Sequence, residues 1–147
     1  KLIHILADVV SKNGNLLLNI APSPQGDFHA EAYDRLQEIG RWMDINSEAI
    51  YGTTGDNSIG TQGKLVFTHK PDAVYAIYRA EEGENLPGKI GINNLNLDKK
   101  AKIYLLGSKD PLKWSDENGA ISITIPEKTA KIVSNSYAWV FKIVKNS

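Results

Sequence analysis

The sequence predicts a mixed α and β protein in which a piece of an α/β layer is followed by an antiparallel β-sandwich of about seven strands. Residues 2–46 have the pattern of a helix, a buried strand and a second helix. After about residue 60 the pattern changes to short strands separated by turns. The 147 residues, 41% of them hydrophobic, are enough for the sandwich to bury its own core.

Two segments of the N-terminal region are expected to be helices. Residues 2–12 are apolar nearly all round, which is typical of a short buried helix. Asn13 or Gly14 offers a left-handed residue that would end it. Residues 29–46 carry apolar side chains at helical spacing and charged side chains between them, and Asp27 is expected to cap this second helix.

The segment between these helices is expected to be a buried strand. Residues 15–20 are nearly continuous in apolar side chains and end just before Pro22, which favours a strand covered on both faces, as in a parallel sheet. Such a strand needs hydrogen-bonding neighbours on both sides, and no other part of the chain alternates helix and strand. We therefore infer that residues 1–46 are the tail of a larger α/β domain.

The C-terminal region predicts a series of short strands. Residues 47–62, rich in Ser, Thr, Gly and Asn, form the connector to it. Asn118-Gly119 is a strong signal for a hairpin turn. The candidate strands, at the spacing of a β-sandwich, are residues 64–69, 73–80, 89–95, 101–106, 112–115, 120–125 and 137–145.

Composition argues against several classes of function. The 17 basic and 17 acidic residues give a net charge of zero, so neither nucleic acid nor an anionic membrane is an expected partner. No apolar run approaches the roughly 20 residues of a membrane-spanning helix. Cysteine is absent, and His4, His29 and His69 are far apart in the sequence, so we expect no metal and no cofactor. Because Lys1 is not a methionine, we expect a processed chain or a piece of a longer one.

No catalytic motif is found, so the carboxylates are read as structural. Asp8, Asp27, Glu31 and Glu48 are the candidates for acid–base work, and each is better explained by an ion pair, a helix cap or an anchor. Asn19 interrupts the apolar strand near its C-terminal end, which faces the active site in parallel α/β folds. Its amide is interpreted as a partner for a loop backbone or as a ligand contact.

Aromatic residues of the predicted sandwich have two interpretations. Exposed rings stack on sugars, whereas strand aromatics usually belong to the core, and we favour the core. The residues concerned are Trp114, Trp139, Tyr75, Tyr78 and Tyr104.

Residues 9–22, VVSKNGNLLLNIAP, resemble a signature stretch of the α-L-fucosidases, glycoside hydrolase family 29. The usual family form has glycine where this chain has Ala21, and often Arg-Pro where it has Thr54-Gly55. The resemblance extends over nearly the whole chain. It continues through Arg35-Leu36, Ile39-Gly40, Trp42, Asn46, Glu48 to Thr53, Leu105 to Gly107, Leu112 to Trp114, and Ile121 to Pro126.

The resemblance implies a fold and an activity. Residues 1–52 would be the terminal helix–strand–helix of a (β/α)8-like catalytic barrel with the start of the connector, and residues 53–147 the β-sandwich. The whole protein would be a retaining exo-α-L-fucosidase acting on fucosylated glycans. Its aspartate nucleophile and its acid/base both lie upstream, so no catalytic residue is expected here. The chain would complete the barrel together with the upstream residues, and the sandwich would support the barrel. The chain alone would be inactive.

Asn19, Ala21 and Pro22 would then lie nearest the substrate, at the rim of the active site. Absence of cysteine and of glycosylation sequons fits a periplasmic or secreted bacterial enzyme. Two alternatives stay open: a non-catalytic carbohydrate-binding β-sandwich that uses Trp114 or Trp139, and a structural domain whose catalytic partner has lost activity.

Overall fold

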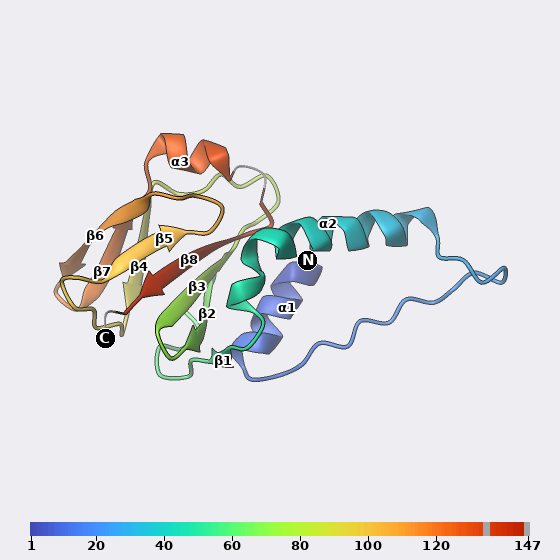
Figure 1. Cartoon of the computed structure of the whole chain (residues 1–147), viewed down its shortest axis with the longest axis horizontal. Coiled ribbons are helices and arrows are strands. Elements are labelled where there is room, and N and C mark those ends of the chain that lie inside the picture. Colours follow the sequence, from blue (N-terminus) through green and yellow to red (C-terminus); the bar gives the residue numbers. More distant parts are fainter. Residues whose placement is uncertain (134–135, 146–147) are drawn as a thin grey trace.

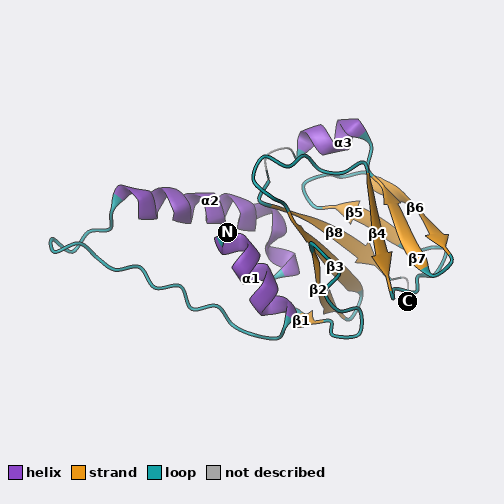
Figure 2. Cartoon of the chain, turned by 180° about the vertical axis from the view of Figure 1, so that it is seen from behind, coloured by secondary structure: helices purple, strands orange, loops and turns teal. Residues whose placement is uncertain are grey.

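The computed structural model of the protein describes residues 1–133 and 136–145. Helices α1 (Leu2–Ser11) and α2 (Ala30–Asn46) lie side by side against one face of a β-sheet, and a short 3-10 helix, η1 (Ser47–Ala49), follows α2. Helix α3 (Glu127–Ile132) lies over the other half of the sheet (Figures 1 and 2). Both helices predicted in the N-terminal region are confirmed.

One antiparallel sheet of eight strands forms the C-terminal region, in the order β1-β2-β3-β8-β5-β6-β7-β4. All seven predicted strands are present, and the two-residue β1 is added. The strand order is continuous, so the sheet curls on itself where two separate layers were predicted. The strands are β1 (Thr54–Gly55), β2 (Leu65–Lys70), β3 (Ala73–Arg79), β4 (Lys89–Asn93), β5 (Lys102–Leu105), β6 (Pro111–Glu117), β7 (Ala120–Thr124) and β8 (Ala138–Val144).

Strands β2, β3 and β8 are buried on both faces. Because side chains alternate along a strand, Val66, Tyr75 and Val140 face the helices, while Phe67 and Phe141 face the inside of the curl. The inner core joins β2, β3 and β8 to β4, β5, β6 and β7, with Ile92, Ile103, Ile121 and Ile123 almost fully buried. The helical region therefore rests on a sheet that has a complete core of its own.

The hairpin between β6 and β7 turns at the predicted Asn-Gly pair. Asn118 has φ 57° and Gly119 has φ 88°, so both central residues take the positive φ that a type I′ turn requires. The Gly119 amide donates a hydrogen bond of 2.8 Å to the Asp116 carboxylate. The turn fixes the register in which β7 pairs with β6.

Helix α1 ends in a Schellman motif whose left-handed residue is Asn13, with φ 62°. The Gly14 amide donates to the Val9 carbonyl over 2.9 Å, closing the last turn. The Asn13 side-chain oxygen accepts a hydrogen bond of 2.7 Å from the Gly55 amide in β1. A Cβ at Gly55 would lie 2.0 Å from the Ser11 carbonyl oxygen, so only glycine allows β1 to approach α1 this closely.

The start of α2 differs from the prediction. His29, not Asp27, is the residue before the helix, and it makes no side-chain capping bond. The Phe28 and Tyr33 rings meet edge-on with 5.8 Å between centroids. They stand immediately before the cap and at the fourth helical position, which is the arrangement of a hydrophobic staple. Apolar packing therefore sets this helix start, and the capping role predicted for Asp27 is wrong.

The predicted strand over residues 15–20 does not form in this chain. The segment is irregular, and Leu17 is 84% exposed. The physical reason is that no strand of the described chain lies alongside to pair with it. Helix α1 is likewise covered on one side only, because Ile3 and Ala7 are buried whereas Ile5 is 40% exposed.

Candidate functional site

The three residues predicted at the rim of an active site lie on the long segment between α1 and α2. This segment runs away from the sheet and returns to the far end of α2 (Figure 1). Asn19, Ala21 and Pro22 are all exposed. The Asn19 side chain makes no hydrogen bond to any other described residue. Beyond them a tight turn closes with the Ser23 amide donating to the Asp27 carbonyl.

Apolar side chains are exposed along this segment and along the side of α2 that projects past the sheet. Contiguous exposed apolar surface of this kind marks an interaction site. Gly40 lies in the middle of α2, where glycine costs about 1 kcal/mol relative to alanine, yet a Cβ there would have no atom within 4 Å. Nothing described in this chain uses the space. The exposed side chains are Leu17, Leu18, Phe28, Tyr33 and Leu36.

Two buried hydrogen bonds hold the end of α2 and the following η1 onto the sheet, and a third lies within α2. The Trp42 indole N–H donates to the Ala138 carbonyl over 2.9 Å, and Trp42 is 5% exposed. The Thr68 hydroxyl donates to the Ala49 carbonyl over 2.7 Å. The Asn46 amide nitrogen donates to the Trp42 carbonyl over 2.9 Å. These bonds fix the direction in which α2 projects.

Glu48 joins η1 to two strands. Its carboxylate accepts hydrogen bonds from the Tyr75 hydroxyl at 2.9 Å and from the Lys142 ammonium at 2.6 Å. Burial alone would raise the pKa of Glu48, but these hydrogen bonds and the charge of Lys142 outweigh it and lower the pKa. Burial and the bond to Glu48 together raise the pKa of Tyr75. The predicted role of Glu48 as an anchor is confirmed by these contacts.

The other candidate carboxylates also have structural partners, except Asp27, which is exposed. Asp8 accepts a hydrogen bond of 2.7 Å from Lys12 and lies 3.4 Å from Arg79 in β3. Glu31 pairs with Arg35 one turn later in α2. These partners are the ordinary ones of surface ion pairs, which fits a structural role for Asp8 and Glu31.

His4 and His69 make contacts in different parts of the chain. His4 donates from Nε2 to the Tyr137 carbonyl over 2.7 Å, linking α1 to the start of β8. His69 lies near the end of β2, and its Nδ1 is 3.8 Å from the Asp56 carboxylate. Within residues 1–133 and 136–145, no three His, Cys, Asp or Glu side chains are grouped so that they could hold a metal ion. No described helix is long and apolar enough to cross a membrane.

Four of the five aromatic residues considered for the sheet belong to its cores or pack against them, namely Tyr75, Trp139, Tyr78 and Trp114. Trp139 is 2% exposed, its ring lies 6.0 Å from that of Tyr78, and its indole donates to the Val133 carbonyl. Trp114 is half-buried and donates to the Ala101 carbonyl over 3.0 Å. The alternative in which exposed Trp114 or Trp139 binds carbohydrate therefore loses its main support.

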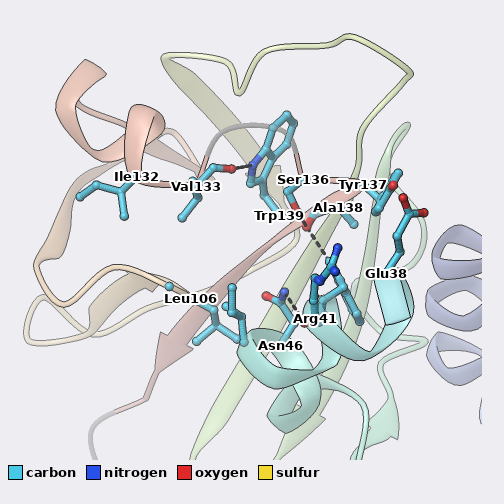
Figure 3. A pocket seen from close by; sticks show the side chains of 13 residues that line it. Glu38, Arg41, Asn46, Leu106, Ile132, Val133, Ser136, Tyr137, Ala138 and Trp139 are labelled. Carbon is cyan, nitrogen blue, oxygen red and sulfur yellow. Dashed lines mark hydrogen bonds between the residues drawn. The ribbon is translucent and has the colours of Figure 1, made fainter. Parts of the chain in front are cut away.

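A cleft of about 320 Å³ lies between α2, the end of α3 and the start of β8 (Figure 3). Ile45, Leu106 and Val133 form aliphatic walls, and Glu38 and Arg41 stand at the α2 side. Sequence reasoning missed this cleft because its walls come from three segments far apart in the chain. The one local signal is that Glu38, Arg41 and Ile45 recur at helical spacing.

Two family models match the chain. The model described as α-L-fucosidase matches residues 1–48, and the model described as α-L-fucosidase C-terminal domain matches residues 60–144. An α-L-fucosidase of Branchiostoma floridae is 31% identical over 97% of this chain and 32% of its own length. The human tissue α-L-fucosidase is 32% identical over 97% of this chain and 31% of its own length.

Solved structures agree with these matches. The α-fucosidase of Thermotoga maritima, in complex with a mechanism-based inhibitor, has a TM-score of 0.81 and 30% identity over 98% of this chain. Isoenzyme 1 of the α-L-fucosidase from Paenibacillus thiaminolyticus has a TM-score of 0.81 at 22% identity and shares the fold. The chain spans about a third of the length of each, 33% and 34%.

Proposed function

Since the chain belongs to the α-L-fucosidase family, we propose that it is the C-terminal part of a retaining exo-α-L-fucosidase that removes terminal α-L-fucose from glycans. Residues 1–52 are the last helix–strand–helix of a (β/α)8 catalytic barrel with the start of the connector. Residues 53–147 are the C-terminal domain of the family, built on the curled antiparallel sheet. The observation that carries this proposal is the family match on both sides of the connector.

The exposed apolar surface supports the barrel assignment. A strand over residues 15–20 inserted between strands of the upstream chain would bury Leu17 and Leu18, and α2 would pack across it through Leu36 and Gly40. Burial of each large aliphatic side chain stabilises the folded state by about 1.5–3 kcal/mol. The partner of this surface is thus the rest of the barrel, and the sheet holds α2 in place for that closure.

The reaction follows from the retaining mechanism. An aspartate attacks the anomeric carbon of fucose and forms a fucosyl-enzyme intermediate, while a carboxylic acid protonates the leaving oxygen. The carboxylate left by that acid then takes a proton from a water molecule as the water attacks the anomeric carbon, which breaks the ester bond to the aspartate and releases fucose with its configuration retained. The two carboxyl groups of such a site lie about 5–5.5 Å apart. Both belong to the upstream chain, so the 147 residues alone are inactive.

Asn19, Ala21 and Pro22 form part of the active-site rim in this proposal. They follow the barrel strand at its C-terminal end, where barrel enzymes carry their active sites. The exposure of all three leaves them available to the upstream chain or to the glycan. A periplasmic or secreted location in a bacterium completes the proposal, supported by the lack of cysteine.

The test is fucose release from an aryl α-L-fucoside by the complete protein that ends in this sequence. We expect release by the complete protein and none by the 147-residue chain. Asn19→Ala in the complete protein is expected to lower the rate of fucose release while leaving the melting temperature unchanged. A rate for the short chain that matches the complete protein would overturn the proposal. Equal losses of rate and stability in Asn19→Ala would reduce Asn19 to a structural role.

A further inference from the structure

The cleft between α2 and α3 lies outside the machinery proposed above. We propose that it is a saccharide-binding site that holds one neutral sugar ring of a glycan, through an aliphatic wall on one side and hydroxyl contacts on the other. Its volume of about 320 Å³ lies at the lower end of the 300–1,000 Å³ typical of small-ligand pockets and exceeds what one water molecule occupies.

The lining of the cleft includes an acceptor that receives no hydrogen bond from the described residues. Asn46 is 4% exposed, and its amide nitrogen donates to the Trp42 carbonyl. Its carboxamide faces the cleft, and no described residue donates to the oxygen (Figure 3). The Asn46 oxygen is not a buried unsatisfied atom, so it is open to the cleft while lacking a hydrogen-bond partner among the described residues. A ligand hydroxyl that enters the cleft would supply that partner.

The charges of the cleft select a neutral ligand. Of the described residues that line it, only Glu38 and Arg41 are charged, and their charges are opposite. Carboxylate oxygens only accept hydrogen bonds and guanidinium groups only donate them, whereas a hydroxyl does both. A ligand that satisfies Glu38, Arg41 and the Asn46 oxygen together is therefore a neutral molecule with several hydroxyl groups.

The walls of the cleft suit the C–H face of a sugar ring. Ile45, Leu106 and Val133 give an aliphatic surface that simple polar ligands do not use. Tyr137 stands at the rim, 43% exposed, and lines the cleft together with Glu38. The Glu38 carboxylate raises the pKa of Tyr137, so its hydroxyl stays protonated. A ring with one apolar face and hydroxyls around its edge matches both kinds of surface.

The cleft stays open when the barrel closes, a step that rests on the proposed function. At 100° per residue along α2, the side that carries Tyr33, Leu36 and Gly40 lies about 140° around the helix from the side that carries Glu38, Arg41 and Ile45. The barrel strand packs on the first side. The second side remains free to bind a sugar ring.

The test measures binding of fucose-free disaccharides to the complete protein, because an exo-α-L-fucosidase has no terminal fucose to recognise in them. Lactose, maltose and chitobiose are titrated by calorimetry and by saturation-transfer NMR. We expect saturable binding of at least one, weakened at least ten-fold by Arg41→Ala and by Tyr137→Ala. Arg35→Ala, on the same helix outside the cleft, is expected to bind like the unchanged protein. Arg41→Ala should release fucose from an aryl fucoside at the unchanged rate.

Two outcomes would overturn the site. One is the absence of binding by all three disaccharides to the unchanged protein. The other is binding that neither Arg41→Ala nor Tyr137→Ala alters, which would place the sugar elsewhere. Absence of fucose release by the unchanged protein is a separate outcome, since it would contradict the proposed activity and leave the binding measurement intact.

Discussion

The helical region, residues 1–52, and the sheet region, residues 53–147, bury their apolar side chains to different extents. Among the described residues, ten large hydrophobic side chains are exposed, and eight of them precede residue 53. The sheet region encloses a core whose isoleucines at 92, 103, 121 and 123 are almost fully buried. The inner core of the sheet is thus complete in itself, whereas the helical region is one side of an interface.

The two regions depend on each other unequally. Helices α1 and α2 are buried where they contact β2, β3 and β8, and exposed where they project beyond the sheet. The inner core of the sheet contains no residue of either helix. Substitutions in the inner core should therefore unfold the chain, and substitutions at the junction should loosen the helices. Substitutions on the exposed face should act only when the upstream chain is present.

The largest effect is expected from Phe141→Ala in the inner core. Phe141 is 0% exposed, and a buried phenylalanine truncated to alanine typically destabilises a protein by about 3–5 kcal/mol. Urea unfolding of the 147-residue chain measures this loss. Tyr51→Ala is the control, because Tyr51 is 69% exposed and a surface change alters stability by about 0.5 kcal/mol or less. Similar losses for the two variants would refute a complete core in the sheet.

Trp42→Phe tests the junction and is expected to cost about 1 kcal/mol, because the Ala138 carbonyl loses the indole donor of Trp42 and keeps only the hydroxyl donor of Ser136. Hydrogen exchange should show the amides of α2 opening more than those of β7. Trp114→Phe removes the same kind of bond, to the Ala101 carbonyl, at a half-buried site where water can replace it. A larger loss for Trp114→Phe than for Trp42→Phe would contradict the importance given to the junction.

Glu48→Gln is expected to cost about 1 kcal/mol at pH 7, a value discounted for the 37% exposure of the Glu48 side chain. The pKa of Glu48 is lower in the folded state than its ordinary value of 4.5. Its contribution to stability is therefore full above pH 4.5 and is lost as the pH falls through the folded value. The urea midpoints of Glu48→Gln and the unchanged chain should converge as the pH falls below the folded-state pKa of Glu48.

A matched change separates this anchor from an ordinary ion pair. Glu127 pairs with Lys131 within α3, and the Glu127 side chain is 83% exposed. Glu127→Gln should shift the urea midpoint by less than Glu48→Gln at pH 7. If the difference in urea midpoint between Glu48→Gln and the unchanged chain stays constant from pH 7 to pH 3, the Glu48 carboxylate is not the group that stabilises the junction.

Local patterns predicted the sheet well and the edges of elements less well. The alternation in β7 and the Asn118-Gly119 turn are properties of a few adjacent residues, and both were predicted from the sequence. Helix α3 was missed because six residues are too few for a helical period to stand out, although Glu127 and Lys131 form a favourable pair along it. The start of α2 was misplaced because the Phe28–Tyr33 staple replaces a polar cap.

Features that need distant segments could not be predicted from local pattern. The cleft combines α2 with Leu106, Val133 and the start of β8, and no spacing in the sequence brings these together. The strand over residues 15–20 shows the opposite case. Its apolar pattern was recognised, but hydrogen-bonded neighbours decide whether a strand forms, and the described chain supplies none.

The smallest effect in the isolated chain is expected from Leu17→Ala, and it sharpens the comparison most. Leu17 is 84% exposed, so its truncation should change the stability of the 147-residue chain by about 0.5 kcal/mol or less. In the complete protein, where residues 15–20 are proposed to be a buried barrel strand, the same change should cost about 2–5 kcal/mol. Ile103→Ala, in the inner core, should cost a similar amount in both. If Leu17→Ala does not change the stability of the complete protein either, residues 15–20 are not a barrel strand. Contact between this chain and the rest of the barrel would then be made by α2 alone.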